Sequence, residues 1–112
     1  MRVTVNGAKG KMGKAVVDYV NNNDAFTLAA EVDLGDSLST SLSNTPADIV
    51  VDFTRPEARM ENIRTILNGG AAAVVGTTGF TPENLKEIEG WVKDTGKGCF
   101  IAPNFIVGNV LM

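Results

Sequence analysis

The stretch that decides the fold is residues 2–20, which read RVTVNGAKGKMGKAVVDYV. Its first part, Arg2–Asn6, is rich in β-branched residues and predicts a short strand. Residues 7–13, GAKGKMG, then form a turn with three glycines. After the turn, the sequence predicts a helix from apolar residues four positions apart, at Met12, Val16 and Val20, with Gly13 and Val17 on the same face. A glycine-rich turn between a strand and a helix is where dinucleotide-binding domains hold a pyrophosphate.

Four further segments are nearly all apolar and predict strands, at Phe26–Val32, Ile49–Phe53, Ala71–Val75 and Cys99–Ala102. Continuous apolar strands are expected to be buried on both faces, as in parallel sheets. Strands alternate with helical segments, so the sequence predicts an α/β, Rossmann-like, doubly wound parallel sheet in a single domain. Residues 35–45, rich in Ser, Thr and Asn, are expected to be mostly loop.

Two later helices carry start signals. Thr54–Glu57 resembles a capping box, and the helix that it opens is expected to bury Met60, Ile63 and Leu67 before Gly69 and Gly70 end it. Thr81 and Pro82 predict the start of another helix. Its apolar residues at helical spacing are Leu85, Ile88 and Val92.

Composition excludes several classes of protein. A chain of 112 residues with 44% hydrophobic and 21% charged residues fits one globular domain. No apolar run approaches the roughly 18 residues that cross a bilayer, so we expect no membrane partner, and a net charge of −3 argues against nucleic acid as a partner. Cys99 lies among apolar neighbours and is expected to be a buried, reduced thiol, which predicts a cytoplasmic protein. The chain has no histidine, and we assign no metal site.

The glycine turn offers the groups that bind an anion, namely backbone N–H groups at a helix N-terminus and nearby ammonium groups. The predicted phosphate-binding residues are Gly7, Ala8, Lys9, Gly10, Lys11 and Met12. The spacing G-x-x-G-x-x-G is one residue longer in its first gap than the common G-x-G-x-x-G. A plain strand-to-helix turn with solvated lysines is therefore the alternative.

Asp33 ends the second predicted strand, about 20 residues after the glycines, where an acidic residue binds the adenosine ribose in Rossmann domains. Glu31 is the alternate candidate, and a turn-forming aspartate ahead of Leu34 and Gly35 is the structural alternative. The carboxylate of Asp33 favours NADH, whereas Lys9 and Lys11 would offset its repulsion of the 2′-phosphate of NADPH. We therefore expect both cofactors to bind.

The other strands end in distinctive sequences, DFTRP at 52–56, GTTGF at 76–80 and APNF at 102–105. Ligands bind beyond the carboxyl ends of strands in open α/β sheets, so these loops are expected to converge on the glycine turn. In this order and spacing, the four motifs resemble those of dihydrodipicolinate reductases, also called 4-hydroxy-tetrahydrodipicolinate reductases. The turn and residues 30–33 are most similar to the actinobacterial branch of that family.

The resemblance implies NADH or NADPH as cofactor and, as the reaction, hydride transfer to a cyclic unsaturated dicarboxylate in the diaminopimelate route to lysine. Beyond the turn and Asp33, the implied cofactor-binding residues are Phe53, Thr54, Gly76, Thr77, Thr78, Ala102, Pro103, Asn104 and Phe105. Thr78 is also implied to touch the substrate.

The resemblance covers the whole chain but only about the first half of a family member. It implies a dinucleotide-binding domain at 1–105, followed at 106–112 by the start of a hinge into a substrate domain. Ile106 stands where the family usually has a small residue. The family's paired histidines belong to the substrate domain, so no catalytic residue is assigned here and the chain alone is expected to be inactive. Complete family members are expected to be homotetramers, and this chain a monomer.

Three other functions explain parts of the sequence. A free-standing NAD(P)-binding module without catalysis would have the same turn. The cofactor domain of another dehydrogenase, acting on semialdehydes or sugar acids, explains the turn but not the three later loops. A nucleotide-free scaffold has no use for the placement of the glycines and lysines.

Overall fold

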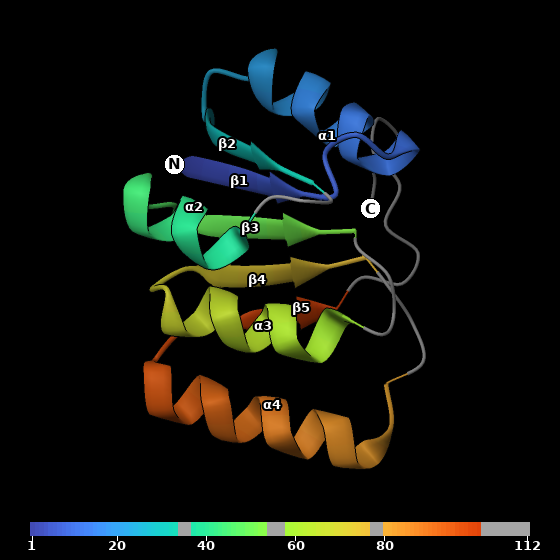
Figure 1. Ribbon diagram of the computed structural model, residues 1–112, viewed down its shortest axis with the longest axis vertical. Coiled ribbons are helices and arrows are strands. Elements are labelled where there is room, and N and C mark those ends of the chain that lie inside the picture. The colour runs from blue at the N-terminus through green and yellow to red at the C-terminus, as the bar shows by residue number, and fades with distance from the viewer. Residues whose placement is uncertain (34–36, 54–57, 77–79, 102–112) are drawn as a thin grey trace.

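The computed structural model describes residues 1–33, 37–53, 58–76 and 80–101 of the chain. Within these ranges, five parallel strands form one sheet with the order β2-β1-β3-β4-β5 (Figure 1). The strands are β1 (Arg2–Asn6), β2 (Thr27–Val32), β3 (Ile49–Asp52), β4 (Ala72–Val75) and β5 (Cys99–Ile101). The helices are α1 (Lys11–Asn21), α2 (Leu38–Asn44), α3 (Arg59–Asn68) and α4 (Pro82–Thr95).

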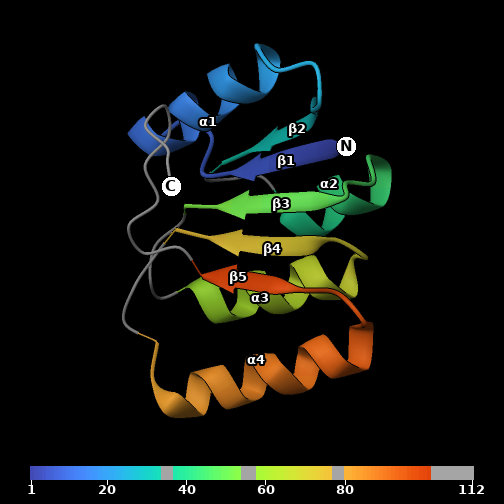
Figure 2. The ribbon, with the colours of Figure 1, turned by 180° about the vertical axis from the view of Figure 1, so that it is seen from behind.

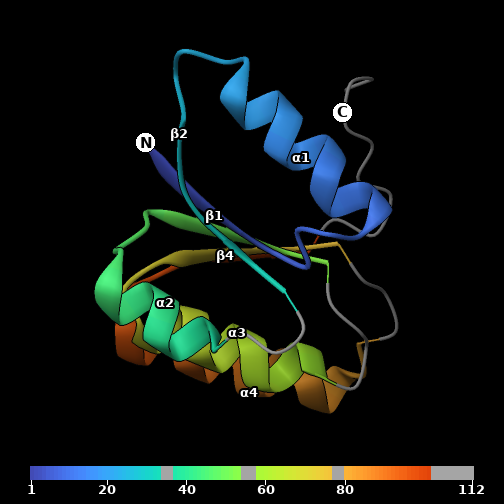
Figure 3. The same cartoon turned by 45° about the horizontal axis from the view of Figure 1, so that its top comes forward.

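Helices cover both faces of the sheet. Figure 3 shows α1 on one side of the strands and α2, α3 and α4 together on the other. From β1 the chain moves through α1 to β2, and it then returns through α2 to β3 on the opposite side of β1. This order confirms the predicted Rossmann-like, doubly wound sheet. The carboxyl ends of β1 and β3 form its switch point, where such sheets bind ligands.

Two apolar clusters hold the layers together. The buried residues of the cluster under α1 are Val3, Val5, Ala8, Val16, Val20 and Val51. On the other face, the buried residues that join α2, α3 and α4 to the sheet include Leu42, Ile63, Ile66, Ile88, Val50 and Val75. Strand β1 contributes Val3 and Val5 to the cluster under α1, whereas β3 contributes Val51 to that cluster and Val50 to the other. Apart from its first residue each strand is buried, as predicted for β3.

The expectation of burial on both faces is wrong for the two edge strands, β2, in which Thr27 and Glu31 are exposed, and β5. Cys99 and Ile101 pack on the side of α3 and α4, so Phe100 between them faces the side of α1. Helix α1 packs against β1 and β2, and Figure 2 shows that it does not extend over β5. Phe100 is consequently 64% exposed.

The predicted helical stripes are correct except in their first turns. Met12 is 36% exposed and Leu85 is 46% exposed, because helices that follow parallel strands begin at the carboxyl edge, where the packed layer ends. Met60, also in a first turn, is only half-buried. The buried side of α4 is formed instead by Ile88 with the half-buried Trp91 and Val92.

The prediction of a loop at 35–45 is wrong, because Leu38–Asn44 forms α2. The hydroxyl oxygen of Ser37 caps this helix by accepting a hydrogen bond from the N–H of Thr40 at 3.2 Å. Leu38 and Leu42, one helical turn apart, are buried in the core. Two leucines give too short a pattern for a confident helix, and tertiary burial decides the outcome.

The described helix ends agree with the predicted signals. Thr81 and Asn84 form a reciprocal capping box at the start of α4, which ends at Gly96 with φ +72°. Gly69 ends α3, and Gly70 follows with φ +85°. The predicted box at Thr54–Glu57 lies outside the described residues. Cys99 is half-buried, and this burial raises the pKa of its thiol to about 11, so the thiol stays protonated at neutral pH.

None of the helices in the described part of the chain is both long enough and apolar enough to cross a membrane.

The contact between α1 and the turn before it predicts that alanine at Gly13 destabilises the protein, although alanine in place of glycine usually stabilises a helix. A Cβ on Gly13 would lie 2.0 Å from the carbonyl oxygen of Gly7 and 2.8 Å from the Cα of Ala8. We expect Gly13→Ala to lower the free energy of unfolding by about 1–3 kcal/mol or more, as overpacking does. Gly90 in α4 has open space around it, so Gly90→Ala should raise the same quantity by about 0.5–1 kcal/mol.

Urea unfolding of the two variants measures both effects. Helix propensity alone would make both substitutions stabilising. A stabilised Gly13→Ala variant would therefore contradict the close contact between α1 and the turn.

Candidate functional site

The predicted ligand-binding segments converge on the carboxyl edge of the sheet, as far as they are described. Backbone hydrogen bonds continue past the strand ends and tie each loop to its neighbour. They run from the N–H of Gly7 to the C=O of Val32 (2.7 Å), from Phe53 to Asn6 (3.0 Å) and from Gly76 to Asp52 (3.0 Å). The structure thus brings Gly7, Asp33, Phe53 and Gly76 to one edge, at and beside the switch point.

The turn after β1 depends on glycine at two positions. Gly7 has φ +88°, a conformation that side chains disfavour. Its carbonyl oxygen accepts a hydrogen bond from the N–H of Gly10 at 3.1 Å, and it is the same oxygen that leaves no room for a side chain on Gly13. The turn is therefore tight, and Gly10 at the start of α1 has no side chain to cover its backbone.

The N-terminus of α1 has the electrostatics of an anion site. Its N-cap, Gly10, provides no side-chain acceptor, and no acidic residue lies in the first turn. The first N–H groups of a helix have no partner within it. Lys11 and Lys14 add positive charge at this end, which is unfavourable next to the positive pole of the helix until an anion approaches. By contrast, α2 and α4 are capped by side chains.

Asp33 is joined to the turn directly. Its Oδ2 accepts a hydrogen bond from the backbone N–H of Lys9 at 2.5 Å. A carboxylate has about four lone-pair sites and can accept more than one hydrogen bond. Glu31, the alternate candidate, lies within β2 and is paired in register with Val5. The geometry favours Asp33 over Glu31, because Asp33 directly follows β2 and its carboxylate is hydrogen-bonded to the turn.

Phe53 lies between two glycines at the switch point. Its backbone would be 3.3 Å from a Cβ on Gly7, and its ring would be 2.4 Å from a Cβ on Gly76. Gly76 is thus needed because the Phe53 ring occupies the place of a side chain. This packing fixes the first residue of the loop after β4 against the loop after β3.

A buried polar pair at the same edge was not identified from the sequence. The Nδ2 of Asn6 donates to the Oδ1 of Asp52 at 3.2 Å, and the residues are 5% and 1% exposed. Asp52 ends the otherwise apolar strand β3, and Asn6 follows the β-branched residues of β1. This change to a polar residue was the signal available in the sequence.

Seven of the predicted site residues lie outside the described residues: Thr54, Thr77, Thr78, Ala102, Pro103, Asn104 and Phe105. Lys9, Gly10, Lys11 and Met12 are exposed on the turn and the first turn of α1. Among the residues that the structure does describe, no three His, Cys, Asp or Glu side chains are grouped to hold a metal ion.

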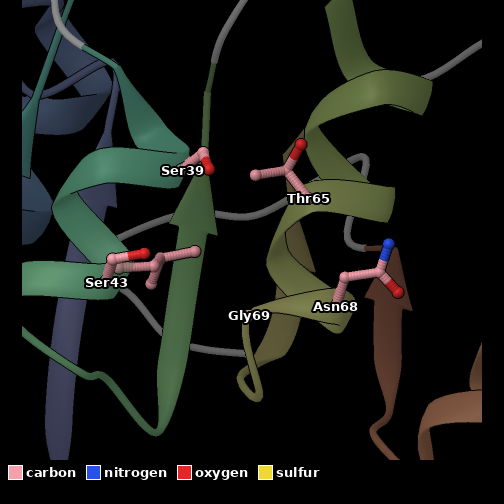
Figure 4. A pocket seen from close by; sticks show the side chains of 6 residues that line it. Ser39, Ser43, Thr65, Asn68 and Gly69 are labelled. Carbon is pink, nitrogen blue, oxygen red and sulfur yellow. The ribbon is translucent and has the colours of Figure 1, made fainter.

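Away from this edge, a pocket lies in the helix layer, between α2 and α3 (Figure 4). It has a volume of about 470 Å³, and the side chains of Ser39 and Ser43 line it from α2 while Thr65 and Asn68 line it from α3. The lining groups are hydroxyls and an amide without charge. They offer nothing to balance a pyrophosphate, so this pocket is not the dinucleotide site.

Comparison with known proteins shows the family. A family model described as "Dihydrodipicolinate reductase, N-terminus" matches residues 1–105. The 4-hydroxy-tetrahydrodipicolinate reductase of Mycobacterium marinum is 47% identical over 112 residues, and that of Mycolicibacterium smegmatis is 46% identical. Each match covers 99% of this chain but 45% of the relative, so the chain spans less than half the length of these relatives.

Solved structures agree with these matches. A dipicolinate-bound dihydrodipicolinate reductase from Paenisporosarcina superposes with a TM-score of 0.84 and 28% identity, over 96% of this chain and 49% of that protein. The scyllo-inositol dehydrogenase of Lactobacillus casei, with bound NAD(H), has a TM-score of 0.75 at 14% identity, over 90% of this chain and 35% of that one, and supports the fold alone. The predicted resemblance is confirmed, and the chain belongs to the dihydrodipicolinate reductase family, whose N-terminal part it matches.

Proposed function

We propose that this chain is the NAD(P)H-binding part of a 4-hydroxy-tetrahydrodipicolinate reductase. The observation that carries the proposal is the tight, glycine-rich turn at the switch point, followed by a helix N-terminus with Lys11 and Lys14 and no side-chain cap. The family match and the printed names of the mycobacterial relatives support it. In the complete enzyme, hydride would pass from NADH or NADPH to a cyclic dicarboxylate in lysine and diaminopimelate biosynthesis.

The residues of the chain would bind and orient the cofactor, which supplies the hydride when bound. The backbone of residues 7–12 would hold the pyrophosphate, and Asp33 would accept hydrogen bonds from the adenosine ribose. Phe53 and Gly76 would border the nicotinamide side. The other residues proposed to contact the cofactor are Thr54, Thr77, Thr78, Ala102, Pro103, Asn104 and Phe105, and Thr78 is also proposed to touch the substrate.

The domain arrangement and partners follow from the same proposal. Residues 1–105 would form the dinucleotide-binding domain, and 106–112 would begin the connection to a substrate domain. The complete enzyme would be a cytoplasmic homotetramer, whereas the chain of 112 residues would be a monomer whose partner is the dinucleotide. Neither nucleic acid nor a membrane is a proposed partner.

The first test is direct binding. Calorimetry with NADH up to about millimolar concentration should show one site, weaker than in a complete enzyme, because closure by a second domain adds contacts and preorganisation. Thermal unfolding in the presence of NADH should shift upward by mass action. If neither heat nor stabilisation is seen with NADH or NADPH, the proposed function is wrong.

The second test concerns catalysis. The chain contains no histidine, and the geometry described here assigns no group to donate a proton. We expect no NADH oxidation above background when the purified chain is mixed with a dihydrodipicolinate-type substrate. Turnover by this chain would show that the rest of the enzyme is dispensable.

The third test measures cofactor preference. NADH and NADPH affinities should differ by no more than about tenfold, since Asp33 and the lysines act on the 2′-phosphate in opposite directions. Replacing both Lys9 and Lys11 with Ala should weaken NADPH binding, by up to about tenfold, more than NADH binding. Asp33→Asn should shift preference toward NADPH, because the amide oxygen still accepts from the N–H of Lys9 while the negative charge is removed.

Calorimetric dissociation constants for both cofactors check this preference. Lys93→Ala, in the last turn of α4, is the matched control and should change neither constant. Equal losses for NADH and NADPH in the double lysine variant would assign the lysines to the shared pyrophosphate and not to the 2′-phosphate. Added salt should reproduce the NADPH-selective loss in the parent chain.

A further inference from the structure

The polar pair Asn6 and Asp52 lies where two neighbouring strands, β1 and β3, lead to helices on opposite faces of the sheet. The two residues are register partners at the ends of β1 and β3. After Asn6 the chain leads to α1 on one face of the sheet, and after Asp52 it leads to α3 on the other (Figure 3). The two loops thus leave the switch point in opposite directions, and this gap is where the dinucleotide is proposed to lie.

Stability alone gives no reason for this pair. Burying a carboxylate is costly even when it is hydrogen-bonded. The preceding register pair in the same strands, Val5 with Val51, is apolar and buried. Replacing both partners of a buried hydrogen bond by apolar groups of similar shape can be nearly neutral or stabilising. A polar pair in this position therefore calls for a role other than holding the sheet together.

The pair is joined to the residues that shape the gap. Asn6 immediately precedes Gly7, and Asp52 immediately precedes Phe53. The N–H of Phe53 donates to the C=O of Asn6 at 3.0 Å, and the Asn6 side chain donates to Asp52 at 3.2 Å. The two strand ends are thus linked through backbone and side chain at once.

We propose that Asn6 and Asp52 are positioning residues for the dinucleotide: their side-chain hydrogen bond sets the separation between the glycine turn and the loop after β3. This inference rests on the proposed function. It assigns a role to two residues that would not touch the cofactor themselves. They act through Gly7 and Phe53, the residues that follow them in the chain; a Cβ on Gly7 would lie 3.3 Å from the backbone of Phe53.

The test compares stability with affinity in four forms of the chain. The first is the parent, and the second is the double variant Asn6→Leu with Asp52→Leu, which replaces the pair by apolar side chains. The third, Asp52→Asn, keeps an oxygen that accepts from Asn6. The fourth is the control Ile66→Val, which alters a buried residue of α3 away from the pair. Thermal unfolding gives the stability, and calorimetry with NADH gives the dissociation constant.

We expect the double variant to melt at the same temperature as the parent or higher, yet to bind NADH about tenfold more weakly. That factor corresponds to a binding-competent arrangement reduced to about a tenth of the population. Asp52→Asn should bind NADH within about twofold of the parent, because its hydrogen bond survives. Ile66→Val should lose stability, through a lost methylene group, with unchanged affinity.

Unchanged NADH affinity in the double variant overturns the positioning role. So does a large loss in Asp52→Asn, which would mean that the charge of Asp52 acts by itself. If the double variant does not fold, Asn6→Ser, whose side chain is too short to reach Asp52, is judged by the same affinity criterion. Failure of the parent chain to bind NADH is a different result, because it overturns the proposed function and this role with it.

Discussion

Helix α1 lies so close to the turn before it that Gly13 has no room for a side chain. This contact brings the helix N-terminus down onto the carboxyl edge of the sheet, because the turn is held to β2 by the bonds of Gly7 and Ala8 to Val32. The direction of α1, the burial of Val16 and Val20, and the bare backbone at the N-terminus all follow from it. One atomic contact thus sets both the packing of a layer and the shape of a site.

The sequence predicted the strands and three of the four described helices because their patterns are local. A run of β-branched residues, or apolar residues at helical spacing, reports the face that each element buries. Helix α2 was missed because only Leu38 and Leu42 carry its pattern, and both depend on the core beneath them. The exposure of three apolar side chains, Met12, Leu85 and Phe100, could not be predicted from local patterns either. Their exposure depends on where the sheet and α1 end, which is a property of the complete fold of the chain.

The candidate site shows the same division. The glycine turn and Asp33 could be predicted, since a strand, a turn and a helix in succession have one arrangement. The contact of Phe53 with Gly76 and the bond of Asn6 with Asp52 could not be predicted in the same way. Each joins segments that are neighbours only because β3 lies between β1 and β4. The sequence shows Asn6 and Asp52 as polar residues after β-branched ones, but it does not say that they face each other.

The hydrogen bond from Lys9 to Asp33 has a thermodynamic consequence for the whole site. Because the carboxylate that would meet the ribose also restrains the turn that would meet the pyrophosphate, the two halves of the dinucleotide would not be recognised independently. Substitutions at Asp33 and in the turn should then be non-additive, with a coupling free energy that a double-mutant cycle would isolate. A ligand with only the adenosine half of the dinucleotide would already restrict the conformations of the turn. The nicotinamide half would then bind to a protein backbone that is already partly ordered.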